Sequence, residues 1–220
     1  MLSAEFWIMF AQGLWETVYV TVLSTLFAYI IGLPLGLLLA VTDADGLRPN
    51  PAVSKVFGTV VNLLRSVPFL IMVFLLNGLT RLIIGTTVGS PAMIPPLVIA
   101  AFPFVARLVE ASAREVDRGV IEAAESMGAS PLQIVTRVIL PEATPSLITG
   151  ATTATVTILG YSAMAGILGG GGLGAIAINY GYYRKESAIM WVAVVLIVVL
   201  VQILQGAGNR IAARSDRRIR

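Results

Sequence analysis

A polar segment in the middle of the chain reads Glu122-Ala123-Ala124-Glu125-Ser126-Met127-Gly128 and separates two apolar parts of the sequence. Asp117 precedes it and can accept a hydrogen bond from the first free N–H groups of a helix, as aspartate does at N-caps. Gly128 can adopt the left-handed backbone conformation in which many helices end. The segment therefore predicts a short helix that begins after Asp117 and ends at Gly128.

A second helix start follows immediately, at Ser130-Pro131-Leu132-Gln133. Ser130 at the N-cap and Gln133 form a capping box, and Pro131 stands where its missing N–H has no cost. Apolar residues then recur at helical spacing, and we expect Pro141 to end the helix. The apolar stripe comprises Leu132, Val135, Val138 and Ile139. Residues 117–141 therefore predict two short helices joined by a forced turn, here called the elbow.

Hydrophobic residues make up 57% of the 220 residues and charged residues only 12%, with a mean hydropathy of +0.88. Soluble domains carry about 25% charged residues, so this composition places the chain in the membrane class. Cysteine and histidine are both absent from the sequence. Disulfides, thiolate or imidazole metal sites and histidine-based catalysis are therefore excluded, which leaves carboxylates as general acids or bases.

Apolar stretches long enough to cross a bilayer core, which requires about 20 residues of helix, occur along the whole chain. We therefore predict an all-α integral membrane protein with five transmembrane helices and the two-helix elbow between the third and the fourth. The expected spans are residues 14–41, 57–84, 95–109, 145–168 and 188–207. Residues 1–13 are expected to be an external segment, residues 14–209 the membrane domain, and residues 210–220 a basic tail with five arginines.

Two of these spans contain residues that a regular membrane helix avoids. Gly32, Pro34 and Gly36 predict a kink or a tight helix contact in the first span. Arg65 and Arg81 interrupt the second span. We expect their guanidinium groups to reach opposite interfaces or to face the protein interior.

Basic residues are distributed unequally between the two sides of the predicted membrane domain. Eleven lie in the loop after the first span, in the elbow region and in the tail, whereas the opposite side holds Arg184 and Lys185. The positive-inside rule therefore places the N-terminus outside and the elbow and the C-terminus in the cytoplasm. A cleavable signal peptide is not expected, because the first basic residue is Arg48 and a positive n-region is missing.

The elbow resembles the EAA signature of binding-protein-dependent ABC importer permeases, in which Glu-Ala-Ala is followed after three residues by glycine and later by proline. In that family the signature forms coupling helices that sit in a cleft of an ATPase subunit. The small alanines permit close approach, and a glutamate can anchor a charge-assisted contact. An ordinary amphipathic cytoplasmic loop is the alternative interpretation. The coupling residues that the resemblance implies are Glu122, Ala123, Ala124, Gly128, Leu140 and Pro141.

Two further motifs resemble amino-acid permeases of the same family. Arg65-Ser66-Val67-Pro68-Phe69 is similar to their second-span motif. Tyr161-Ser162-Ala163-Met164-Ala165-Gly166, with four glycines at 169–172, is more narrowly similar to the permeases of methionine importers. The resemblance implies import of methionine, in either enantiomer, or of close analogues by alternating access. Another amino acid is the alternative substrate. An ion-coupled secondary transporter is less favoured, because the span centres hold almost no titratable groups.

The resemblance also implies a complex in a bacterial inner membrane. Its expected partners are a second copy of this chain, two ABC ATPase subunits, an external solute-binding protein or lipoprotein, the amino-acid substrate and the lipid bilayer, but no nucleic acid. The sequence contains no G-x-x-x-x-G-K-[ST] motif. We therefore expect ATP and Mg on the ATPase partner, no cofactor or metal on this chain, and a transport role rather than an enzymatic one.

Two groups near the ends of the spans are candidate functional residues. Ser162 and Met164 lie just before the glycine turn and are candidates for the translocation path or its gate, although packing is the commoner role of a membrane methionine. Arg107, Glu110 and Arg114 are spaced to form helix-surface ion pairs. Such pairs would stiffen the junction between the third span and the elbow.

Overall fold

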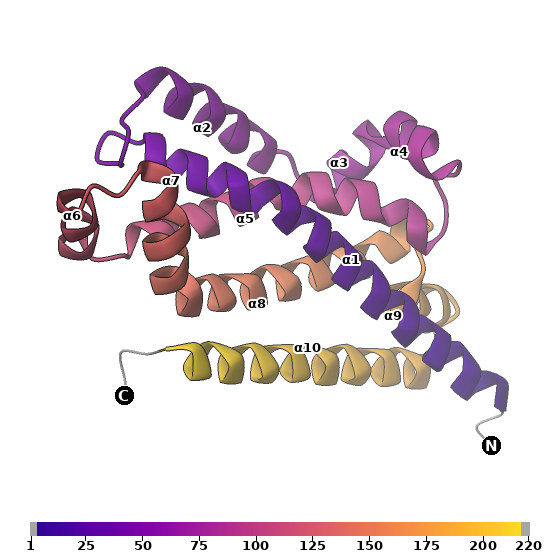
Figure 1. Ribbon diagram of the computed structural model, residues 1–220. Helices are drawn as coiled ribbons and strands as arrows, with labels where there is room; N and C mark the ends of the chain where they lie inside the picture. Colours follow the sequence, from indigo (N-terminus) through magenta and orange to yellow (C-terminus); the bar gives the residue numbers. More distant parts are fainter. Residues whose placement is uncertain (1–3, 217–220) are drawn as a thin grey trace.

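The computed structural model describes residues 4–216, which form helices and the turns between them and contain no strand. Four long helices run through the molecule, and shorter helices lie beside them and at the ends (Figure 1). The long helices are α1 (Ala4–Thr42), α5 (Ile94–Arg114), α8 (Leu140–Ala165) and α10 (Ser187–Ser215). α6 (Arg118–Ser126) and α7 (Pro131–Ile134) lie together at one end, here called the elbow end. The predicted all-α class is confirmed.

Four helical segments are each long and apolar enough to cross a membrane: Ala4–Thr42, Ser90–Arg114, Pro131–Leu168 and Ser187–Ser215. A fifth crossing results if α2 (Pro51–Arg65) and α3 (Phe69–Leu75) count as one span, which is bent by 99° at its break. The prediction of five membrane-spanning elements is therefore confirmed when the broken pair is counted as the fifth. The first of them begins at Ala4, so residues 4–13 extend the first span as helix.

The second span was predicted as one stretch over residues 57–84, and this is wrong. The chain forms three helices there, α2, α3 and α4 (Asn77–Ile84). Pro68 lies at the N-cap of α3 with an extended ψ of 139°, because a proline and the residue before it disfavour a continuing helix. Arg65 and Arg81 are both exposed, so neither faces the interior of the subunit.

α5 is the central helix and packs against α1, α2, α3 and α8. Two glycines of α1 allow the backbones of α1 and α5 to lie in direct contact. A Cβ atom at Gly32 would stand 2.9 Å from the carbonyl oxygen of Phe102, and one at Gly36 would collide with the carbonyl of Ala106. α1 continues as helix through Pro34. Of the two alternatives predicted for this region, the tight helix contact is found.

The helix that starts at Pro131 does not end at Pro141, contrary to the prediction. It passes through a π-helical segment, η2 (Val135–Ile139), and continues as α8. Pro141 lies in the first turn of α8, and the wider π turn precedes it, so the chain bends there without stopping. Figure 1 shows α7 turning into α8 at this point. The second elbow helix and the fourth span are therefore one bent helix.

The end opposite the elbow is closed by the chain that follows α8 and the short η3 (Gly166–Leu168). Gly169 and Gly172 have φ values of +83° and +85° and make the predicted turn. They lead into α9 (Gly172–Ile176) and the π-helical η4 (Ala177–Tyr183), which the sequence did not predict. η1 (Ser90–Met93) lies against the same loop, since the N–H of Gly89 donates to the carbonyl of Gly169 at 2.8 Å.

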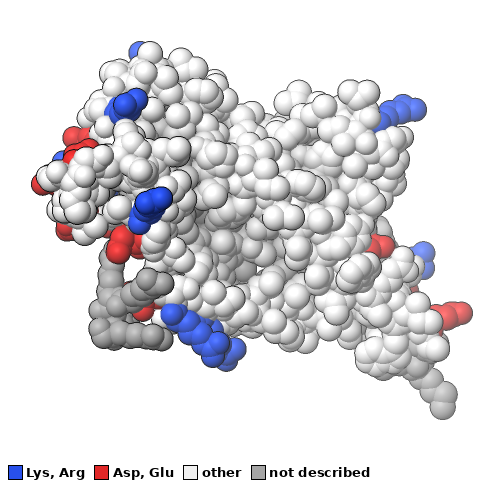
Figure 2. Space-filling view, viewed as in Figure 1, with Lys and Arg blue, Asp and Glu red and all other residues white. Residues whose placement is uncertain are grey.

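Charged side chains gather at the two ends of the molecule, and the face between them carries none in the view of Figure 2. An uncharged band of this kind is what the hydrocarbon core of a bilayer requires. α10 extends to Ser215, past the predicted end at residue 207, so Arg210 and Arg214 of the tail are helical. Arg217, Arg218 and Arg220 lie outside the described residues.

Candidate functional site

The first elbow helix, α6, begins and ends where its sequence predicts. Asp117 is the N-cap, and its Oδ1 atom accepts a hydrogen bond of 2.8 Å from the N–H of Gly119. Gly128 follows the helix with a φ of +81°, which a residue with a Cβ atom rarely adopts. The two alanines of the motif differ in role. Ala124 is buried against Ile134, whereas Ala123 is exposed.

The second elbow helix begins with the predicted capping box. The N–H of Ser130 donates to Oε1 of Gln133 at 2.8 Å, and the N–H of Gln133 donates to Oγ of Ser130 at 3.4 Å. The predicted apolar stripe is wrong at one position, because the side chain of Leu132 is 73% exposed. Ile134, which the stripe omitted, is 1% exposed and anchors the helix to α6.

The outer surface of the elbow combines apolar and acidic side chains. Val120, Met127 and Leu132 are 44%, 82% and 73% exposed. Glu122 and Glu125 are also exposed, on the side of α6 that faces the loop after α1. An element that exposes both kinds of side chain is typical of a protein contact surface, in which apolar side chains supply buried area and carboxylates select for a basic partner.

A cavity of about 280 Å³ separates the elbow from the loop that follows α1. One ion pair spans it, between Arg118 at the start of α6 and Asp45 in that loop, with 3.7 Å between Nη2 and Oδ1. Both side chains are more than two-thirds exposed, so this pair contributes little to stability. The charged residues that line the cavity are Asp43, Asp45, Arg114, Arg118, Glu122 and Glu125.

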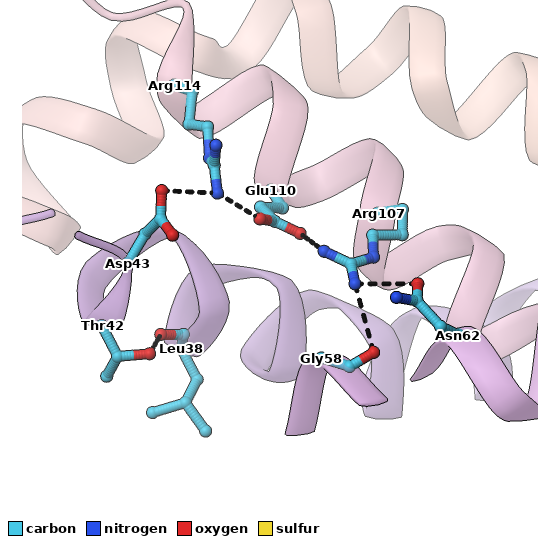
Figure 3. Close-up of polar contacts among 8 residues, drawn as sticks. All are labelled: Leu38, Thr42, Asp43, Gly58, Asn62, Arg107, Glu110 and Arg114. Carbon is cyan, nitrogen blue, oxygen red and sulfur yellow. Dashed lines mark hydrogen bonds and ion pairs between the residues drawn. The ribbon is translucent and has the colours of Figure 1, made fainter. Parts of the chain in front are cut away.

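The predicted ion pairs on α5 are confirmed and extend to two other segments (Figure 3). Glu110 is 6% exposed, and its carboxylate lies 2.6 Å from Nη1 of Arg107 and 2.5 Å from Nη2 of Arg114. The guanidinium of Arg114 also pairs with Asp43, just beyond α1, at 2.8 Å. A buried carboxylate is stable only when it is paired in this way.

Arg107 joins α5 to α2 on the other side of this network. Its Nη2 atom donates to Oδ1 of Asn62 at 2.9 Å and to the carbonyl of Gly58 at 3.2 Å (Figure 3). Gly58 and Val61 are the buried residues of α2, and these two bonds add a polar contact to the packing of Val61 against Leu39 and Ala106. The sequence predicted the three residues on α5 but offered no signal for Asp43, Gly58 or Asn62, because their contact depends on how α1 and α2 fold back.

The remaining predicted residues do not gather at one place. Leu140 is half-buried and Pro141 is exposed, both at the bend between the elbow and α8. Ser162 and Met164 lie near the opposite end of α8 on different faces. Ser162 is 8% exposed and donates to the carbonyl of Leu159 at 2.9 Å, whereas Met164 is 41% exposed. Within residues 4–216, no cluster of three His, Cys, Asp or Glu residues is arranged to hold a metal.

A family model described as "binding-protein-dependent transport system inner membrane component" matches residues 32–220, which include the broken span, the elbow and α8. This chain belongs to that family. A member of this family is a transport component of the inner membrane.

Individual relatives are similar over nearly the whole chain. A protein of Vibrio cholerae serotype O1, described as a probable D-methionine transport system permease, is 47% identical over 93% of this chain and 91% of its own length. The methionine import system permease of Bacillus subtilis is 47% identical over 82% of each chain. A chain of the MetNI methionine ABC transporter, solved in inward facing conformations, superposes with a TM-score of 0.95 and 42% identity. The match covers 98% of this chain and all of that one.

Proposed function

We propose that this permease imports methionine, in its D or L form, or close analogues. The observation that carries the proposal is the superposition on the MetNI chain, with a TM-score of 0.95 at 42% identity and no unmatched domain in either chain. The names of the relatives from Vibrio cholerae and Bacillus subtilis favour the same substrate. The Tyr161 to Gly166 motif supports the same substrate, because it is similar to the corresponding motif of methionine importer permeases.

We propose that the elbow is the surface on which an ATPase subunit docks. The exposed apolar side chains of Val120, Met127 and Leu132 would enter the ATPase, and Glu122 would meet a basic residue there. ATP and Mg would then bind to the ATPase. This chain would move with the ATPase and take no part in hydrolysis. Because the second elbow helix continues through η2 into α8, a displacement of the elbow would act directly on the fourth span.

The full complex, in our proposal, contains two copies of this chain, two ATPase subunits and an external solute-binding protein or lipoprotein. The N-terminus lies outside and the elbow and the C-terminus lie in the cytoplasm, as the excess of basic residues at the elbow end favours. Closure of the ATPases would draw the two elbows together, and the membrane helices would alternate between outward and inward access.

Of the two candidate gate residues, we propose Met164. Its side chain is 41% exposed on the chain and available to a path or to a second copy. Ser162 is buried and its hydroxyl is already bonded to the Leu159 carbonyl, so we assign it to packing within the subunit.

Uptake of labelled methionine tests the proposed function. The permease, its ATPase and its binding protein are reconstituted in liposomes, and uptake is measured with ATP inside and with each other amino acid as competitor. We expect ATP-dependent methionine uptake that unlabelled D- and L-methionine reduce and other amino acids do not. ATP-dependent uptake of a different amino acid, with none of methionine, would overturn the substrate and leave the transport class intact.

A further inference from the structure

Arg65 is an exposed arginine in the apolar middle of the chain, in the last turn of α2. The depth of Arg65 in the membrane domain follows from the contact between Asn62 of the same helix and Arg107 of α5. Asn62 is bonded to Arg107, which stands seven residues, or about 10 Å, before the end of α5 at Arg114. Arg65 lies almost one helical turn further along α2, away from the elbow end (Figure 1). It is therefore close to the level of the middle of α5.

The guanidinium of Arg65 has no hydrogen bond and no ion pair within residues 4–216. A guanidinium does not lose its proton in proteins, so the charge cannot be removed by titration. A charge at this depth in a membrane must therefore face water, an anion or a second protein chain.

A second copy of the chain has no carboxylate to offer at this level. Three of the twelve acidic residues, Glu5, Glu16 and Glu186, belong to the end opposite the elbow, and the others lie at or near the elbow end. Glu110 reaches furthest inward from the elbow end, and its two oxygens already pair with Arg107 and Arg114. The anion that matches Arg65 therefore comes from outside this chain.

The surface of α2 around Arg65 is divided into a polar stripe and an apolar stripe. Val56, Val60 and Leu63 are exposed on one face, as lipid contact requires. Thr59, Asn62 and Ser66, at helical spacing, are exposed on another face, and Arg65 adjoins them. Ser66 donates to the carbonyl of Asn62 at 2.8 Å, and Oδ1 of Asn62 accepts from Arg107. The guanidinium of Arg65 is the charged group of this surface that still requires water or a polar partner, because lipid cannot satisfy it.

α8 exposes Thr149 and Thr153, whose hydroxyls donate to carbonyls of the same helix at 3.1 and 3.0 Å and can still accept a hydrogen bond. α2 and α8 both pack on α5. Further from the elbow, Phe69 of α3 stacks on Tyr161 of α8, with ring centroids 5.0 Å apart and planes inclined by 6°. Phe69 is 7% exposed and Tyr161 is half-buried, so within this pair only Tyr161 presents accessible surface.

We propose that Arg65 binds the α-carboxylate of the transported amino acid in the translocation path. The exposed polar residues of α2 and α8 would line the part of that path that contains water. A guanidinium pairs with a carboxylate through two parallel N–H···O bonds, which gives orientation as well as affinity. Tyr161, which is half-buried and stacked on the buried Phe69, offers the accessible part of its side chain to the side chain of the same substrate. This inference deepens the proposed function and rests on it.

The test compares Arg65→Gln with Arg65→Lys and with Arg81→Gln, a control at another exposed arginine of the same region. Each permease is reconstituted with its ATPase and binding protein, and methionine uptake per ATP hydrolysed is measured. We expect Arg65→Gln to lower uptake per ATP about tenfold with hydrolysis nearly unchanged, because one charge-assisted contact is lost. Arg65→Lys should retain part of the uptake, and Arg81→Gln should match the wild type.

A binding measurement without the binding protein isolates the contact with the carboxylate. Saturation-transfer NMR is recorded with millimolar methionine, and with methioninol, in which a CH₂OH group replaces the carboxylate. Relative to wild type, Arg65→Gln should weaken the methionine signal and leave the methioninol signal unchanged. Both complexes contain the same ATPase, so the difference between them reports on Arg65 alone.

Three results would overturn the assignment. The first is wild-type uptake per ATP by Arg65→Gln, and the second is equal methionine signals from both complexes. The third is a joint loss of uptake and hydrolysis that grows with the anionic lipid content of the liposomes, which would assign Arg65 to a lipid phosphate. The wild-type complex separates this inference from the proposed substrate. If it transports another amino acid, the same comparison is made with that amino acid, because every α-amino acid carries the carboxylate.

Discussion

The Oε2 atom of Glu16 accepts a hydrogen bond of 2.8 Å from the backbone N–H of Gly172, 156 residues further along the chain. The same oxygen accepts from Oγ of Ser90 at 2.7 Å. Thr17, next to Glu16, accepts from the N–H of Leu173 at 2.9 Å. One carboxylate of α1 therefore ties together η1 and the glycine loop at the end opposite the elbow.

Removal of this carboxylate is expected to loosen that end of the molecule. Glu16→Ala leaves the hydroxyl of Ser90 and the N–H of Gly172 without their acceptor, at a cost of about 1–3 kcal/mol. The apparent melting temperature of the purified protein in detergent should fall. Glu5→Ala, an exposed glutamate of the same helix, is the matched control and should melt as the wild type does. Equal melting of all three proteins would contradict the role of Glu16.

Gly171 is constrained by the same contact. A Cβ atom at this position would collide with Oε2 of Glu16 and Oγ of Ser90. Gly171→Ala should therefore lower the melting temperature as Glu16→Ala does, and the double variant should lower it little further, because both changes break one contact. Additive losses would show that the two residues act separately.

Gly36 is expected to be the most sensitive position in the contact between α1 and α5. A methyl group there would collide with the carbonyl of Ala106 and stand 2.7 Å from Cβ of Val109. Gly36→Ala should cost about 1–3 kcal/mol as the helices separate. Gly78→Ala is the control, since nothing lies within 4 Å of a Cβ atom at that helical glycine. Thermal melting of both variants measures the difference, and a stable Gly36→Ala protein would refute the close contact.

Glu122→Lys should weaken binding of the ATPase while leaving the permease inserted and folded. Glu122 is exposed on the elbow, and reversal of its charge would repel a basic partner. The amount of ATPase that co-purifies with the tagged permease is the measurement. Glu186→Lys, at the opposite end of the molecule, is the control for net charge. Normal recovery of the ATPase with Glu122→Lys would remove Glu122 from the docking surface.

Gly128 is expected to tolerate asparagine better than valine. Its φ of +81° is left-handed, a conformation that costs an ordinary residue about 1–2 kcal/mol and a β-branched one more. Because nothing lies within 4 Å of a Cβ atom there, the cost is one of backbone conformation and not of space. Gly128→Val should therefore disturb the elbow turn and reduce recovery of the ATPase, whereas Gly128→Asn should retain most of it. Equal recovery would mean that the turn tolerates any residue.

Arg107→Leu is expected to free α2 from α5. The change removes both bonds to α2, yet Glu110 keeps its pair with Arg114, so the protein should still fold. Spin labels on cysteines introduced at Val56 and Ala111 report the distance between the two helices, and the chain has no cysteine of its own to interfere. The distance distribution should broaden in Arg107→Leu and stay narrow in Arg137→Leu, a variant at a distant arginine. An unchanged distribution would mean that the contact of Val61 suffices to hold α2.

Local signals in the sequence determined the ends and turns of many helices. Asp117, Gly128 and the Ser130–Gln133 capping box act on backbone groups within a few residues of themselves, so their effect is visible without the fold. The apolar composition likewise determined that the chain is a helical membrane protein, because a bilayer leaves few other ways to satisfy the backbone. The ion pairs of Glu110 with Arg107 and Arg114 were also predictable from local sequence, because one helix carries all three residues at a spacing of three or four.

Only the tertiary structure decided what those local elements contact. The chain continues through a π segment and past Pro141 but breaks at Pro68, so the presence of a proline alone did not decide whether the helix ended. Asp43 and Asn62 join the Glu110 network, and Glu16 reaches Gly172, through folding that brings distant segments together. Arg65 looked like an interruption in an apolar span. Its exposure beside a polar stripe, without a partner among the described residues, depends on which face of α2 the other helices leave uncovered.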